Sequence, residues 1–372
     1  MKREAKAALT YMLKSARTVL TEAVGHQPPF EYLFWEITDA CNSRCSNCNI
    51  WRVKPSRDVL KPEEVERLFS SGFFKDVKDV IISGGEPVLL PYLEENLLIM
   101  RKHIMPNASV SLSTNGLLPD RVIRTTKNCI KHGMKMIVGV SLDGIGEHHD
   151  LVRGVKGNFE KVDYLLKELK KLKEDESYAN SLKVTIGYTF SPTTFHYFEE
   201  VRDYAESLGM YFLPQMYEEF SYYSNTDRQT SYSEDMIEAA QDMPPSFQKE
   251  LILRCLRKAP IAYKCCSMRK FFVLHCNGDI SPCLRFAHVK VGNIRDLDVT
   301  EVWTGDKVRN ARALVDACKG CSNTWATGWS MRYWMPPFFK MLSSAVIKKH
   351  IARTKGPKTA KESLPQSDTV IS

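Results

Sequence analysis

Three cysteines lie close together near the start of the chain, at Cys41, Cys45 and Cys48. Thiolates at this spacing can bind one metal centre, but a structural zinc site or an ordinary [4Fe–4S] cluster takes four protein ligands. A cluster held by three thiolates leaves one iron open to an exogenous ligand, as a catalytic zinc keeps one position free. The triplet therefore favours a catalytic iron–sulfur site. The alternative is a zinc knuckle that a distant His or Cys completes.

The elements around the triplet predict how it is positioned. The apolar run 32–38 directly before Cys41 predicts a first buried strand. Periodicity predicts further strands at 77–82, 108–113, 136–142, 184–190 and 209–214, and helices at 61–69, 92–103, 119–131 and 198–208. This alternation indicates an α/β fold with a parallel barrel, whose chemistry sits at the carboxyl ends of the strands. Six strand–helix units predict a partial (β/α)6 TIM-like barrel, open enough for a large substrate.

Polar motifs follow the predicted strands. Residues 83–87 (Ser-Gly-Gly-Glu-Pro) follow the second strand, Asn115 follows the third, and residues 141–144 (Ser-Leu-Asp-Gly) end the fourth. Residues 149–159 then read His-Asp-x-x-Arg-Gly-x-x-Gly-x-Phe. Two adjacent glycines let the backbone approach a ligand closely, and a carboxylate just after them can hold a cation. The motifs predict a ligand site at this end of the barrel.

In this order, the motifs resemble those of the radical SAM superfamily. In that family the open iron binds the amino and carboxylate groups of S-adenosylmethionine (SAM), and an electron from the cluster cleaves SAM to a 5′-deoxyadenosyl radical. The resemblance implies that a reductant such as flavodoxin or ferredoxin acts as partner. It implies SAM contacts by Gly84, Gly85, Glu86, Asn115, Ser141 and Arg153. Among these, Glu86 would receive the ammonium, Ser141 the ribose, and Arg153 would lie near the carboxylate.

Two positions leave alternatives open. Asn47 stands where much of the family has an aromatic residue beside the adenine, so either Trp51 or the backbone of Asn47 would make that contact. Arg153 is either a SAM-site residue or a surface residue that closes a turn.

A second group of cysteines comprises Cys255, Cys265, Cys266, Cys276, Cys283, Cys318 and Cys321. Their arrangement around a predicted hairpin turn and the predicted helix 306–317 resembles the twitch form of the SPASM domain, which holds one auxiliary [4Fe–4S] cluster. The resemblance implies the ligands Cys266, Cys283, Cys318 and Cys321, with Cys265 as the alternative to Cys266. A zinc ribbon is the competing interpretation. No role follows for Cys255 and Cys276, and Cys129 is expected to be a buried small hydrophobe.

Composition and charge restrict the function. The 372 residues include 11 cysteines without a secretory signal pattern, which favours a reducing cytoplasm. No apolar run is long enough to span a membrane. Of the net charge of +8, residues 1–27 carry +3 and residues 331–372 carry +6, so the body is close to neutral. A neutral body disfavours long nucleic acid as a partner.

The predicted organisation has five parts. They are an N-terminal amphipathic helix within 1–30, a radical SAM core barrel at 31–230, an auxiliary-cluster module at 250–325, a basic aromatic amphipathic segment at 326–354 and a disordered tail at 355–372. The basic ends either pack on the barrel or make peripheral contact with an anionic membrane.

The prediction is a cytoplasmic radical SAM oxidoreductase or maturase. It would abstract hydrogen from a carbon of a peptide, a sugar or aminocyclitol, a nucleotide or a lipid-linked precursor. The alternative function is a non-catalytic zinc or iron–sulfur scaffold.

Overall fold

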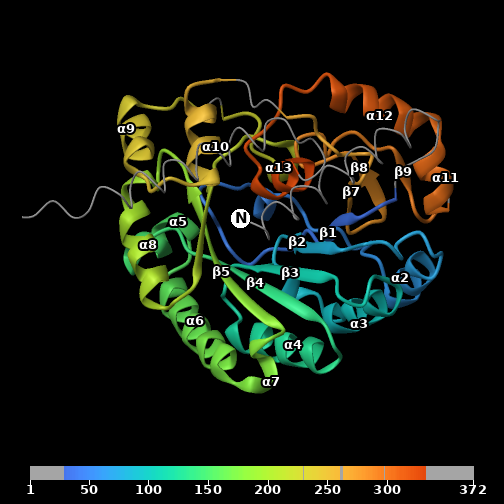
Figure 1. The fold of residues 1–372 in the computed structure, drawn as a ribbon, viewed down its shortest axis with the longest axis horizontal. Coiled ribbons are helices and arrows are strands. Elements are labelled where there is room, and N and C mark those ends of the chain that lie inside the picture. Colours follow the sequence, from blue (N-terminus) through green and yellow to red (C-terminus); the bar gives the residue numbers. More distant parts are fainter. Residues whose placement is uncertain (1–28, 229, 260–262, 297, 332–372) are drawn as a thin grey trace, which may run out of the picture.

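The structure, a computed structural model, describes residues 29–228, 230–259, 263–296 and 298–331. Six parallel strands follow one another in the sheet: β1 (Tyr32–Thr38), β2 (Asp79–Gly84), β3 (Ser109–Thr114), β4 (Lys135–Ser141), β5 (Leu182–Phe190) and β6 (Tyr211–Met216). The short strands β7 (Phe271–Leu274), β8 (Asp279–Ser281) and β9 (Gly292–Asn293) extend it beyond β1. Within the described residues β6 and β9 are its edges (Figure 1). The predicted open, partial barrel is confirmed.

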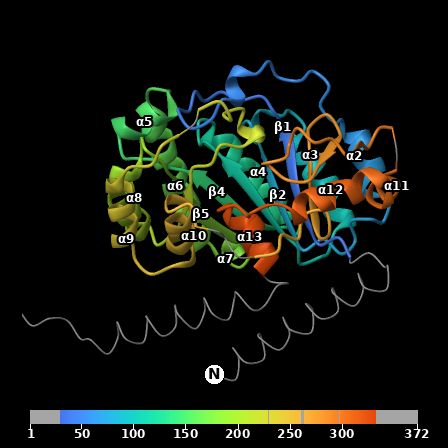
Figure 2. The ribbon, with the colours of Figure 1, turned by 90° about the horizontal axis from the view of Figure 1, so that it is seen from above.

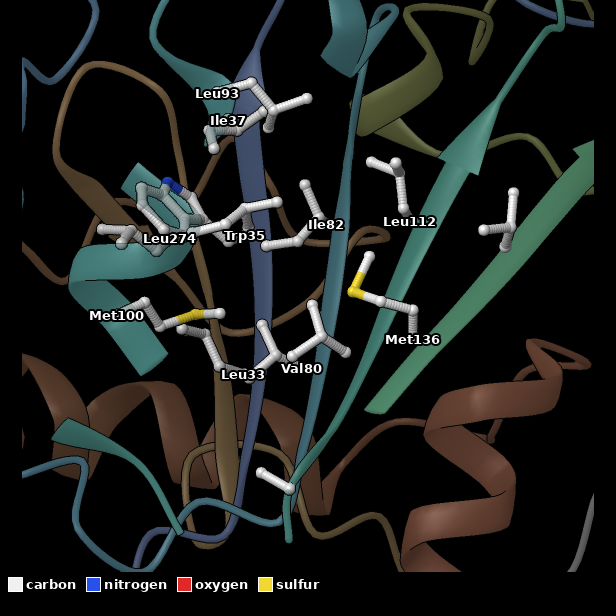
Figure 3. Close-up of a cluster of buried hydrophobic side chains, with 14 of the residues drawn as sticks. Leu33, Trp35, Ile37, Val80, Ile82, Leu93, Met100, Leu112, Met136 and Leu274 are labelled. Atoms are coloured by element: carbon white, nitrogen blue, oxygen red, sulfur yellow. The ribbon is translucent and has the colours of Figure 1, made fainter. Parts of the chain in front are cut away.

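Helices connect the parallel strands on one face of the sheet (Figure 1). They are α2 (Pro62–Phe69), α3 (Leu93–His103), α4 (Pro119–Lys131), α6 (Asn158–Glu174) and α8 (Phe198–Ser207). Alternate residues of β3 and β4 are buried, because successive side chains of a strand point to opposite faces. Figure 3 shows Leu112 and Met136 from these strands beside Trp35 and Ile82 in the apolar core. The opposite face of the sheet carries the polar cavity described below.

Helix α13 (Thr324–Met331) packs against β1 and β7. Trp329 stacks on Tyr32 with ring centroids 4.7 Å apart, and Trp325 stacks on Phe34 at 5.0 Å. Tyr32 and Phe34 alternate along β1 with Trp35, so α13 covers the face opposite the apolar core of Figure 3. The helix crosses the predicted boundary between residues 325 and 326. The rest of the predicted basic segment and the predicted tail lie outside the described residues.

The second group of cysteines is built onto the barrel sheet. Strand β7 pairs with β1 in parallel, with Tyr32 opposite Phe271. Glu31 and Lys270 each lie one residue before this pair, and the buried Lys270 ammonium is 3.3 Å from the carboxylate of Glu31. Helices α11 (Val299–Thr304) and α12 (Asp306–Asp316) complete the module, and Trp303 of α11 packs against Phe272 of β7. The module therefore shares a sheet and a core with the barrel.

Several elements were not predicted from the sequence. They are the helices α6 and α11 given above, α5 (Glu147–Arg153), α7 (Glu176–Ala179), α10 (Phe247–Leu256) and the 3-10 turns η1 (Ile50–Arg52), η2 (Pro87–Leu89), η3 (Phe195–Tyr197) and η4 (Ser221–Tyr223). The polar stretch 218–250 reads in the sequence as a connector with a helix near 233–242, and helix α9 (Glu234–Asp242) lies there. Ser233 and Ser246 cap α9 and α10 by accepting hydrogen bonds from the first-turn amides. The described helices include none with the length and apolarity to cross a membrane. The predicted helix within 1–30 lies outside the described residues.

Candidate active site

The loop that carries Cys41, Cys45 and Cys48 begins at the carboxyl end of β1 and is fastened to neighbouring segments. The amide of Arg44 donates a hydrogen bond to the carbonyl of Arg153 at 2.9 Å. The indole Nε1 of Trp51 donates to the carbonyl of Cys48 at 2.9 Å. Figure 2 shows the loop and α5 at the same end of the strands. These contacts hold the cysteine backbones close to that end of the barrel.

Gly84 and Gly85 bring the end of β2 directly onto this loop. A Cβ atom added at Gly84, where φ is +145°, would lie 1.9 Å from the carbonyl oxygen of Thr38. At Gly85 an added Cβ would lie 2.2 Å from the carbonyl oxygen of Ala40. The amide of Glu86 donates to that same carbonyl at 2.8 Å. Only glycine permits this approach, which places Glu86 beside the cysteine loop.

The Glu86 carboxylate is fully buried and held by residues at the end of β3. Its Oε1 accepts from the Thr114 hydroxyl at 2.9 Å, and its Oε2 accepts from the Asn115 amide at 2.7 Å. Burial raises the pKa of Glu86 to about 7, against the effect of these donors. The Asn115 side chain approaches the sulfur of Cys41, with Nδ2 4.0 Å from Sγ. Two predicted SAM contacts thus meet one predicted cluster ligand.

Arg153 reaches the same place from the end of α5. Its guanidinium Nη2 lies 2.7 Å from Asp143 Oδ2, and its Nη1 lies 3.6 Å from the Sγ of Cys45. The side chain is only 11% exposed, which disagrees with a surface residue that closes a turn. Ser141, at the end of β4, borders the same space.

All these residues line one cavity of about 230 Å³, called the central cavity below. Its walls come from the ends of β2 to β6, the cysteine loop and the segment after β6. They include Cys41, Cys45, Cys48, Gly84, Gly85, Glu86, Asn115, Ser141, Asp143, Arg153, Gln215, Tyr217, Glu218 and Asn323. Asn47 and Trp51 also line it, so the structure leaves both alternatives for the adenine contact open.

The surroundings of the three thiols favour their ionised form only when a metal cluster is bound to them. Burial raises the pKa of Cys41 to about 11 and that of Cys48 to about 12. A bound metal ion supplies the positive charge that lets such thiols ionise. Among the described residues, no three His, Cys, Asp or Glu side chains converge on a single ion. A cubane cluster distributes its thiolates over different irons, so its ligands need not meet at one point.

Four cysteines of the second group lie together. Cys265 and Cys318 lie close enough to Cys283 to raise the pKa of its thiol, and Cys265 and Cys283 do the same to Cys321. The Tyr263 hydroxyl lies 3.3 Å from the Cys321 sulfur. This set contains Cys283, Cys318 and Cys321, as predicted, together with Cys265.

The Cys266 side chain interacts with Cys265 and with residues of α13. Its sulfur accepts from the Ser330 hydroxyl at 3.4 Å, and the side chain packs with Tyr32 and Trp329. The placement favours Cys265 over Cys266 as the fourth ligand, a choice that the sequence had left open. Cys276 and Cys129 are buried, and Cys255 on α10 is half-buried beside Glu218.

Sequence reasoning did not identify Glu218 or Asp143 as site residues. Asp143 lies in the 141–144 motif but was not assigned a role, and the structure gives it the ion pair with Arg153. Glu218 follows β6 in a stretch that reads as a polar connector. The available signal was its position after a barrel strand, where functional side chains collect.

Family comparison agrees with this geometry. The model of the radical SAM superfamily matches residues 35–205, and the SPASM model, an iron–sulfur cluster-binding domain, matches residues 265–322. The chain belongs to the radical SAM superfamily and carries a SPASM domain. The predicted family is confirmed, and with it the [4Fe–4S] cluster with SAM and the additional iron–sulfur cluster that these domains imply.

Individual relatives cover different shares of the chain. The cysteine-type anaerobic sulfatase-maturating enzyme of Clostridium perfringens is 25% identical over 336 residues, which cover 79% of this chain and 86% of that enzyme. The GTP 3′,8-cyclase of Pelotomaculum thermopropionicum is 33% identical over 135 residues, which cover 35% of this chain but only 40% of the cyclase. The crystal structure of Streptococcus suis SuiB bound to precursor peptide SuiA superposes with a TM-score of 0.59 and 17% identity, covering 82% of this chain and 74% of SuiB. At this identity SuiB supports the fold alone.

Proposed function

We propose that this protein cleaves SAM reductively and uses the 5′-deoxyadenosyl radical to abstract hydrogen from a carbon atom of a peptide. The observation that carries the proposal is the convergence of three thiols, Glu86 and Arg153 on the central cavity. When bound by Cys41, Cys45 and Cys48, the cluster would supply the electron for cleavage.

The residues of the cavity suit the polar groups of SAM. The Glu86 carboxylate can accept from an ammonium through Oε2, which accepts only from the Asn115 amide, whereas Oε1 already accepts from Thr114 and from the Val88 amide. The Arg153 guanidinium can attract a carboxylate while its ion pair with Asp143 fixes its orientation. Ser141 offers a hydroxyl for the ribose, and Asn115 an amide beside Cys41.

The relatives support a peptide as the substrate. A sulfatase-maturating enzyme, whose name gives a protein as its substrate, aligns with most of the chain. SuiB, whose structure holds a precursor peptide, adds only that a protein of this fold can bind a peptide. The partial barrel is open, as a peptide segment would require. Sugars, aminocyclitols, nucleotides and lipid-linked precursors remain the other candidate substrates.

An external one-electron donor, such as flavodoxin or ferredoxin, would complete the cycle. The cysteine loop exposes Arg44, Arg52, Lys54 and Arg57. Two of these guanidiniums lie over the Trp51 ring, with centroid distances of 5.2 Å for Arg44 and 4.9 Å for Arg52. A cationic surface beside the cluster would attract an acidic carrier and accelerate its encounter.

The test is formation of 5′-deoxyadenosine by the anaerobically reconstituted protein with SAM and dithionite. Wild type and Cys129→Ala should form it, because Cys129 is a buried thiol of α4 that does not line the cavity. Cys45→Ala should form none. Equal product from Cys45→Ala and wild type, or none from fully reconstituted wild type, would reject the proposal.

A further inference from the structure

Glu218 is a buried carboxylate on the wall of the central cavity that the auxiliary module helps to form. It lies two residues after β6, and its side chain is 10% exposed. Its Oε1 accepts from the amide of Ser322, the residue after Cys321, at 3.1 Å. The same oxygen lies 3.6 Å from Nη2 of Arg285. Both partners of Glu218 therefore belong to the auxiliary-cluster module, which holds its side chain in place.

The other carboxylate oxygen of Glu218 is available. Within the described part of the chain, no donor lies in hydrogen-bond geometry to Oε2, and the only further polar group close to the carboxylate is the Ser322 hydroxyl, which lowers its pKa. Glu86, the other glutamate of the cavity, differs because both of its oxygens already accept. A carboxylate oxygen that accepts no hydrogen bond from the protein can accept one from a donor on a ligand.

The charges around Glu218 favour a cationic donor. Arg285 is its cation partner, but this guanidinium also interacts with the thiols of Cys283, Cys318 and Cys321. Four thiolates that held a zinc ion or a [4Fe–4S] cluster would carry a net negative charge even after the positive charge of the metal is counted, and Glu218 adds to it against the single guanidinium of Arg285. The remaining negative potential would attract a positively charged ligand.

We infer that Glu218 forms a subsite for an ammonium group of the substrate, such as a lysine side chain or another amine of the peptide. This inference rests on the proposed function, because it assigns the substrate of the same cavity. SAM enters from the Glu86 side and the ammonium of the substrate binds Glu218 on the opposite, auxiliary side. Glu218 thereby determines specificity and orients the substrate in the cavity.

The probe is n-butylammonium, a lysine side-chain mimic, compared with its neutral isostere n-butanol. Binding of each is measured by ligand-observed NMR to the reconstituted full chain with saturating SAM, which fills the Glu86 side. Glu219→Gln is the matched control, since Glu219 is the neighbouring carboxylate and holds the Thr230 amide instead of lining the cavity. Wild type and Glu219→Gln should bind the amine about tenfold more tightly than the alcohol, the effect of one charge-assisted hydrogen bond.

Glu218→Gln should remove this preference, and Glu218→Asp should keep part of it. Equal affinity of wild type for the two probes, an unchanged preference in Glu218→Gln, or displacement of SAM by the amine would overturn the inference. Iron content and melting temperature check that Glu218→Gln is folded; if it is not, the wild-type preference and Glu218→Asp decide. Formation of 5′-deoxyadenosine by wild type tests the proposed function separately from the ammonium subsite at Glu218. Cleavage of SAM without amine preference rejects only the subsite, and amine preference without cleavage rejects only the proposed function.

Discussion

Replacing Glu86 with Gln should weaken SAM binding and leave the fold and the iron content unchanged. The structure permits the exchange because the Gln amide oxygen can keep the bond from the Asn115 amide. The Gln amino group can donate to the Thr114 hydroxyl, which rotates to accept. The exchange removes the charge and the 3.4 Å hydrogen bond from the Val88 amide to Oε1, because an amino group cannot accept it. A hydrogen bond to a charged group contributes about 1.5–3 kcal/mol, so the affinity for SAM should fall about 10- to 150-fold.

The pKa of Glu86, raised to about 7 by burial, adds a pH dependence to this prediction. At about pH 6 most Glu86 carries a proton and resembles Gln, whereas at about pH 8 most is ionised and can pair with an ammonium. The ratio of the wild-type to the variant affinity should therefore grow as pH rises from 6 to 8. Because the ratio is taken for one ligand, titration of SAM itself cancels.

The assay is anaerobic isothermal titration of SAM into reconstituted protein. Glu95→Gln is the control, since Glu95 is an exposed carboxylate in the first turn of α3. Its affinity should match that of wild type. An affinity for SAM that Glu86→Gln does not change at about pH 8 would show that Glu86 only shapes the turn, and would refute the reasoning.

Three further predictions concern the second group of cysteines, the packing of α13 and the basic end of the chain. Cys265→Ala should remove about four irons whereas Cys266→Ala should remove none, and the reverse result by iron analysis would assign Cys266 instead. Trp329→Ala should lower the free energy of unfolding by about 3–5 kcal/mol in chemical denaturation, because the ring is buried against Tyr32; a loss below about 1 kcal/mol would contradict this packing. If residues 332–372 bind an anionic membrane, the full chain should sediment with anionic liposomes at low salt and be released by salt, whereas a chain truncated after Met331 should not; equal sedimentation would reject membrane contact.

The barrel could be predicted because its signals are local. Each of the six parallel strands is a short apolar run, and the runs end in motifs that the fold places at one edge. The positions of Gly84, Gly85 and Glu86 followed from their place after the second strand. Their contact with the loop through Thr38 and Ala40 required the structure, because it depends on the pairing of β1 with β2.

Other features depend on contacts between segments far apart in the sequence. The four residues of β7 carry too short a pattern to show that they pair with β1. Cys265 and Cys266 are adjacent and identical, so only their surroundings distinguish them. Glu218 has no motif around it, and its role depends on the approach of Ser322 from the other end of the chain. Sequence patterns therefore predicted candidate cluster ligands but gave no signal for Glu218 on the other wall of the cavity.

The most direct test of the account is the iron content of the anaerobically reconstituted protein and of two multiple-alanine variants. Three thiolates on one cluster and four on another predict about eight irons per chain, with equal sulfide. Replacing Cys41, Cys45 and Cys48 together should leave about four irons and abolish formation of 5′-deoxyadenosine. Replacing Cys265, Cys283, Cys318 and Cys321 together should also leave about four irons, but cleavage of SAM should persist. Stoichiometric zinc with little iron in the wild-type protein would contradict the account.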